Sequence, residues 1–195
     1  MIARTGLGLR AQKGGAVAVA VVLEGGKPRV VSSTLLATHA EGDRLSLEPY
    51  RVAHGLGQGR AAEAADAVAE GRARQDRLAE AGLRAIVDGP FVAALLVNRA
   101  GWVTNLLDYS LAWPDHVPVA EGLAVREALR TGLRACGVET LELDEKSLPE
   151  RAAERLGLAS AEIDARLKAL GKAVGGPWRK EQKLACLAGW IAALG

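Results

Sequence analysis

The stretch GLGLRAQKGGAVAVAVV, residues 6–22, decides the fold of this chain. It predicts two strands, at 4–11 and 16–23, joined by a tight glycine turn. Valine and alanine alternate in the second run, which is typical of a strand with one buried face. A further turn signal, GGKP, leads into a third strand at 29–38. Three strands joined by tight turns predict an antiparallel meander.

The rest of the chain alternates helical and strand patterns after an irregular region at 39–59. The apolar run FVAALLV predicts a strand that is buried on both faces. Glycine and proline mark the ends of the helical patterns. The predicted elements are long helices at 60–87, 119–136 and 178–194, short helices at 147–156 and 160–171, and strands at 91–97 and 138–145. This β-β-β-α-β-α-β-α order predicts an α/β fold with a mixed five-stranded sheet flanked by helices, and we expect residues 1–195 to form one domain.

Composition excludes several classes of protein. The chain has 195 residues, 49% of them hydrophobic and 25% charged, which is typical of a globular domain. No apolar run approaches the ~20 residues that span a bilayer, and the first ten residues lack the apolar segment of a secretory signal. We therefore expect a cytoplasmic protein without a membrane partner. The two cysteines, Cys136 and Cys186, form no C-x-x-C motif, which favours buried thiols over a zinc site.

The net charge of +2 is too small to indicate a nucleic-acid partner, but the distribution of charge is uneven. Residues 166–183 hold six lysines and arginines against the single acid Glu181. Such a cluster can neutralise phosphates, and it is also common on a solvated helix face. The candidate nucleic-acid-binding cations are Lys172, Arg179, Lys180 and Lys183.

Aromatic residues gather in GWVTNLLDYSLAWPDH, residues 101–116. Trp102 and Trp113 are candidates for stacking on unpaired bases or for anchoring a partner protein. The alternative is that these side chains pack the segment against its own core.

The element order, with the meander first and one helix before each later strand, resembles the ribonuclease-H-like superfamily. Within it the chain looks most like the bacterial Holliday-junction resolvases. LGLRAQKGGAVAV near the start and KEQKLACLAGWIAAL near the end carry the resemblance, which covers nearly the whole chain at the level of element order. It implies cleavage of phosphodiesters by two divalent metals held on carboxylates. It also implies one acid on the first strand, one at or after the fourth strand, and one or two at the start of the last helix.

This chain departs from that pattern, because the first-strand position carries Arg10. Glu181 is the closest match in the last helix, and Glu121 holds a similar place in the helix before it. Both head stripes of apolar residues that face the sheet, yet an acid near a helix N-terminus is also favoured by the helix dipole alone. Asp108, after the fourth strand, is a third candidate. If the site is active, Glu121, Glu181 and Asp108 would hold Mg²⁺ or Mn²⁺.

The sequence therefore predicts a ribonuclease-H-like, resolvase-related nucleic-acid-binding protein with a degenerate or absent nuclease site. Its expected ligand is branched or structured DNA. Two alternatives stay open: an active Mg²⁺-dependent, structure-specific DNA endonuclease, and a homodimeric protein-interaction module without nucleic acid. Whether the protein is an enzyme depends on whether three carboxylates converge. We expect Arg10 to bond to Glu121 or Glu181 and so to replace the metal charge with a fixed cation.

Overall fold

A computed structural model describes residues 4–86, 89–98 and 103–195. Its sheet has five strands: β1 (Thr5–Gln12), β2 (Gly15–Glu24), β3 (Lys27–Ala37), β4 (Phe91–Val97) and β5 (Thr140–Asp144). The longer helices are α3 (Ala61–Ile86), α5 (Val117–Ala135), α6 (Leu148–Leu156), α7 (Ser160–Val174) and α8 (Lys180–Leu194). Shorter helical elements are α1 (Arg44–Leu47), α2 (Pro49–Leu56), η1 (Gln58–Arg60), α4 (Leu106–Ala112) and η2 (Pro114–His116).

The sheet is mixed, with the strand order β3-β2-β1-β4-β5. Strands β1, β2 and β3 pair antiparallel, and Gly14 takes a φ of 73° in the tight turn between the first two. Strand β1 also pairs parallel with β4, and β4 pairs parallel with β5. The predicted meander and the mixed five-stranded sheet are both confirmed.

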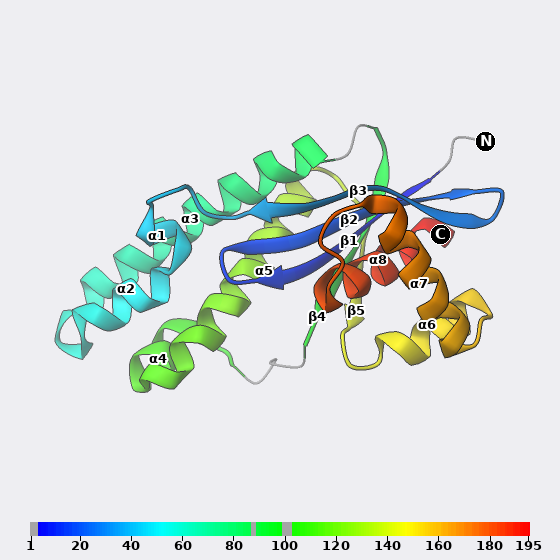
Figure 1. Cartoon of the computed structure of the whole chain (residues 1–195). Helices are drawn as coiled ribbons and strands as arrows, with labels where there is room; N and C mark the ends of the chain where they lie inside the picture. The colour runs from blue at the N-terminus through cyan, green and yellow to red at the C-terminus, as the bar shows by residue number, and fades with distance from the viewer. Residues whose placement is uncertain (1–3, 87–88, 99–102) are drawn as a thin grey trace.

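Helix α8 packs directly onto β1, because glycines line the contact. A Cβ added to Gly8 would lie 1.7 Å from the carbonyl oxygen of Ala185, and one added to Gly6 would lie 2.0 Å from that of Gly189. Both distances are far below van der Waals contact. In Figure 1 the red helix α8 crosses in front of the sheet over the blue strands. The glycines of GLGL therefore allow the last helix to approach the central strand.

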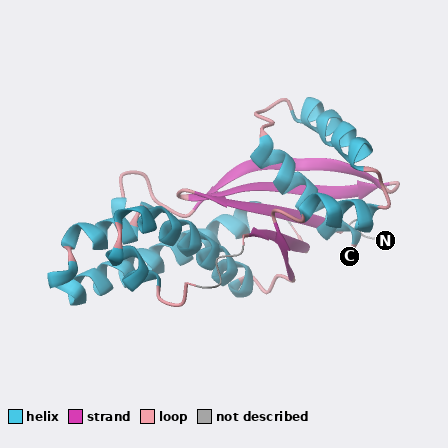
Figure 2. Cartoon of the chain, turned by 90° about the horizontal axis from the view of Figure 1, so that it is seen from below, coloured by secondary structure: helices cyan, strands magenta, loops and turns pink. Residues whose placement is uncertain are grey.

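Two apolar cores lie on opposite faces of the sheet. One joins β2, β4 and β5 to α6, α7 and α8, with Trp190 buried in it. The other joins the opposite face to α3 and α5. A third, smaller cluster joins α2, α3 and α5 around Tyr50. Figure 2 shows this part of the helical layer extending beyond one end of the sheet. Cys136 and Cys186 are free thiols, and Cys186 is fully buried.

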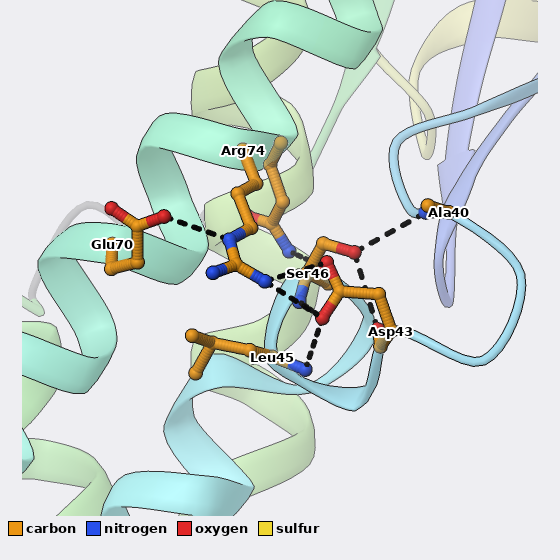
Figure 3. A network of polar contacts seen from close by, with 7 residues as sticks. Ala40, Asp43, Leu45, Ser46, Glu70 and Arg74 are labelled. Atoms are coloured by element: carbon orange, nitrogen blue, oxygen red, sulfur yellow. Dashed lines mark hydrogen bonds and ion pairs between the residues drawn. The ribbon is translucent and has the colours of Figure 1, made fainter.

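Residues 39–59 were predicted to be irregular, and this is wrong because they contain α1 and α2. The Asp43 carboxylate accepts hydrogen bonds from the backbone N–H of Leu45 and Ser46, at 3.0 and 3.4 Å, and so caps α1. Arg74 of α3 donates to both oxygens of the same carboxylate, at 3.2 and 3.1 Å (Figure 3). The segment is therefore held by side-chain caps and by α3.

The close packing of this segment on α3 depends on Gly71. A Cβ at that position would lie 2.5 Å from the carbonyl oxygen of Leu45 and 2.6 Å from the Cβ of Pro49. The described part of 101–116 also contains helical turns, α4 and η2. Among the described residues, no helix combines the length and the apolar character needed to cross a membrane.

Candidate nucleic-acid interface

Arg10 lies on β1, on the same face as Gly6 and Gly8, and points toward the α8 side of the sheet. Its guanidinium makes a bidentate ion pair with Glu145, which directly follows β5. Nε donates to Oε2 at 3.1 Å and Nη2 donates to Oε1 at 3.0 Å. The two side chains are 22% and 27% exposed. The expected bond from Arg10 to Glu121 or Glu181 is therefore wrong, because the carboxylate beyond the end of β5 takes that place.

Glu181 and Arg10 nevertheless share a pocket. Both residues line one pocket of about 790 Å³, which we call the Arg10 pocket. Strands β1 and β3 and the start of α8 form this pocket, and Arg179 and Gln182 also line it. Glu181 is half-buried in the first turn of α8, as the helical pattern predicted. The pocket thus combines two arginines, one carboxylate and several neutral polar groups.

Glu121 lies on α5 and has a different environment, because its carboxylate contacts the N-terminus of α2. Its Oε1 accepts the backbone N–H of Arg51 at 2.9 Å, and its Oε2 is buried with no hydrogen-bond partner. The residue is only 7% exposed. Burial raises the pKa of Glu121 to about 7, against the opposing effect of the backbone N–H groups of Arg51 and Tyr50. The chemistry of Glu121 is that of a helix cap.

Asp108 is exposed in the first turn of α4, where it accepts a hydrogen bond from the Asn105 side chain at 2.6 Å. Its role in the structure is local. Among the described residues, no three histidine, cysteine, aspartate or glutamate side chains gather as metal ligands. Glu121, Glu181 and Asp108 each have a separate environment, and the first-strand position holds an ion-paired cation. The described residues therefore do not fit the pair of metal ions that the resemblance implies.

The candidate cations surround the start of α8. Lys172 lies in the last turn of α7, Arg179 directly precedes α8, and Lys180 and Lys183 lie in its first turns. All four side chains are exposed, and within the described ranges none has an ion pair. Lys180 and Lys183 border a separate apolar cavity of about 370 Å³ between α7 and α8. Cations are unfavourable at a helix N-terminus, so helix stability does not account for Arg179, Lys180 and Lys183. Lys172, at the C-terminal end of α7, is favoured by the dipole of that helix.

Of the two candidate tryptophans, Trp113 directly follows α4 and is 66% exposed. Trp102 lies outside the described residues. By contrast, Trp178 donates to the carbonyl oxygen of Leu167 at 2.8 Å, and Trp190, on α8, is buried in the apolar core. Exposure on this scale makes Trp113 available for contact with a partner.

Glu145 is the residue of this region that sequence reasoning missed. It is the last residue of the strand predicted at 138–145, VETLELDE, and that pattern does not indicate its partner. Side chains along a strand point alternately to the two faces of the sheet. By this alternation Glu145 falls on the same face as Leu141 and Leu143, which pack on the α8 side. The parallel pairing of β5 with β4, and of β4 with β1, then brings its carboxylate to Arg10.

The strand order, the meander and the final helix on the central strand define a ribonuclease-H-like fold. The chain is similar to Thermus thermophilus RuvC in complex with a Holliday junction substrate, with a TM-score of 0.52 and 11% identity over 96% of this chain and 92% of that one. It is also similar to a second Thermus thermophilus RuvC structure, with a TM-score of 0.49, 13% identity and the same coverage. Comparison with protein-family models and with curated proteins finds no match. The predicted resemblance to the bacterial Holliday-junction resolvases is confirmed for the fold.

Proposed function

We propose that this protein binds nucleic acid, with branched DNA as the preferred ligand, and that it does so without metal-dependent cleavage. The observation that carries the proposal is the group of four exposed cations around the start of α8. None of them has a carboxylate partner within the described residues. Phosphate groups bind at helix N-termini through the backbone N–H groups and the dipole, and cations add to both effects. The Arg10 pocket lies beside them and adds a further arginine.

The proposed absence of cleavage rests on the Arg10–Glu145 ion pair. A guanidinium on the central strand repels divalent metals, and it holds a carboxylate that would otherwise be a possible ligand. The catalytic roles considered for Glu121 and Glu181 are therefore not part of the proposal. The choice of branched DNA rests on the similarity in fold to a resolvase whose structure contains a Holliday junction.

A salt titration with a labelled four-way junction tests the binding surface. If Lys172, Arg179, Lys180 and Lys183 each neutralise one phosphate, log Kobs should fall with log salt with a slope of about −3.6. The double variant Lys180→Gln, Lys183→Gln should bind more weakly and lower the slope by about 1.8. A control with the same change in charge is Lys27→Gln, Arg44→Gln, which alters two exposed cations on β3 and α1.

Equal losses of affinity in the two double variants would show a general effect of net charge and would remove the start of α8 from the proposal. Replacing Trp113 by alanine adds an independent readout. If this tryptophan stacks on an unpaired base, the variant should lose affinity for the junction and keep its affinity for duplex DNA.

A further inference from the structure

A second polar pocket lies on the other side of the sheet from α8. Its volume is about 890 Å³, and residues of α3, α4 and α5 line it at the carboxyl end of β4. Ligands of open α/β sheets bind in crevices outside the carboxyl ends of the strands. Three arginines line the pocket: Arg72 of α3, and Arg126 and Arg130 of α5. We call it the Arg126 pocket.

Arg126 is the exceptional residue of this pocket. Its side chain is half-buried, and its Nε is enclosed without a hydrogen-bond acceptor. Within the described part of the chain it makes no ion pair. Burial lowers the pKa of Arg126, and the positive charges of Arg130 and Arg10 lower it further. The negative charge of Glu145 opposes this shift. A guanidinium that is desolvated and lacks a bonded anion is costly in free energy.

The other two arginines differ in whether they already have acidic partners. Arg130 is held by Glu127 and by Glu142, with 3.0 Å between its Nη2 and Oε2 of Glu142. Arg72 lies beside the Tyr50 hydroxyl: burial raises the pKa of Tyr50, and Arg72 opposes that shift. Three arginines and two glutamates line the pocket, so its net charge is +1, and both glutamates pair with Arg130 and not with Arg72 or Arg126.

We propose that the Arg126 pocket binds a phosphate monoester of mononucleotide size, with the phosphate on Arg126 and Arg72. A guanidinium offers two parallel N–H donors that match two phosphate oxygens. The lining also includes three leucines, Leu106 and Leu107 of α4 and Leu123 of α5, whose apolar side chains suit a base or another flat group. The volume is within the range of small-ligand sites. This inference is independent of the proposed DNA surface, which lies on the α8 side.

Calorimetric titration of the full chain with AMP, adenosine and inorganic phosphate tests the site. AMP should bind, adenosine should bind at least about tenfold more weakly, and phosphate should compete with AMP, because the charged hydrogen bonds are shared. An oligonucleotide with a 5′-phosphate, compared with its 5′-hydroxyl form, distinguishes the end of a strand from a free ester. A 5′-phosphate strand that binds more tightly than AMP would assign the site to strand ends.

Arg126→Met should raise the Kd for AMP about tenfold or more and should raise the melting temperature of the free protein, since a desolvated charge is removed. Arg134→Met is the matched control, because Arg134 is an exposed arginine of the same helix. If Arg126→Met does not fold, Arg72→Met makes the same test from α3. No heat of binding for AMP at about 10 mM, tenfold above a Kd of about 1 mM, would overturn the proposal. So would an Arg126 or Arg72 variant that binds AMP as the wild type does.

Discussion

The buried carboxyl of Glu121 should make the stability of the protein depend on pH in a way that one substitution removes. Its pKa is about 7 in the folded state and 4.5 in the unfolded chain. The folded state therefore binds the proton more tightly, and between these two values the free energy of unfolding should fall as pH rises. The full difference of 2.5 pKa units corresponds to about 3 kcal/mol, and about 2 kcal/mol of it falls between pH 5 and 7.5.

Glu121→Gln keeps an oxygen for the backbone N–H of Arg51 and removes the titrating proton. We compare the two proteins by the difference in their free energies of unfolding, variant minus wild type. This difference should rise by about 2 kcal/mol from pH 5 to pH 7.5, because only the wild type loses stability over that range. Urea denaturation followed by circular dichroism at several pH values measures this difference, in which contributions common to both proteins cancel. Glu154→Gln makes the same change at an exposed carboxyl on α6 and serves as the control. A difference for Glu121→Gln that stays constant within about 0.5 kcal/mol across the range would refute the reasoning.

Three further predictions concern the packing of the sheet. Gly8→Ala should destabilise the protein by about 3 kcal/mol or more in chemical denaturation, because the added Cβ would overlap the backbone of α8. The control is Gly122→Ala, which should be neutral or stabilising because nothing lies within 4 Å of the added Cβ. A double-mutant cycle on Arg10 and Glu145 should give a coupling of about 1–2 kcal/mol, between the values for exposed and buried pairs, and a coupling near zero would contradict the bidentate pair. Trp190→Ala should cost about 3–5 kcal/mol by the same assay, and a loss below about 1 kcal/mol would contradict its place in the core.

The sheet could be predicted because each of its strands has a local signal. The valine–alanine alternation of β2, the apolar run of β4 and the glycine turns are visible over a few residues. Helices α1 and α2 are only 4 and 8 residues long, which is too short for apolar spacing alone to indicate a helix. They depend on the Asp43 cap and on contact with α3, which joins residues about 30 positions apart. A pattern of apolar residues does not report such contacts.

The candidate site was predictable in its position and not in its partners. Arg10 was placed correctly on the central strand, facing the last helix, and Glu181 was placed correctly in the first turn of that helix. The partner of Arg10 is 135 positions away, at the end of a strand whose register is set by pairing. Glu121 was assigned to the sheet side by its helical stripe, but α2 occupies that side. The single domain, the possible homodimer and the cytoplasmic location stay predictions.

The most direct test of the central claim is the binding of the wild-type protein to a labelled four-way junction between about 50 and 200 mM salt, with EDTA and with Mg²⁺ or Mn²⁺. The same samples are then run on a denaturing gel. We predict binding with a slope of about −3 to −4 in log Kobs against log salt. Affinity should be equal with and without the metal once ionic strength is matched, and the strands should stay intact on the gel. Strands cut only in the samples with metal, or no binding at the lowest salt, would contradict the claim.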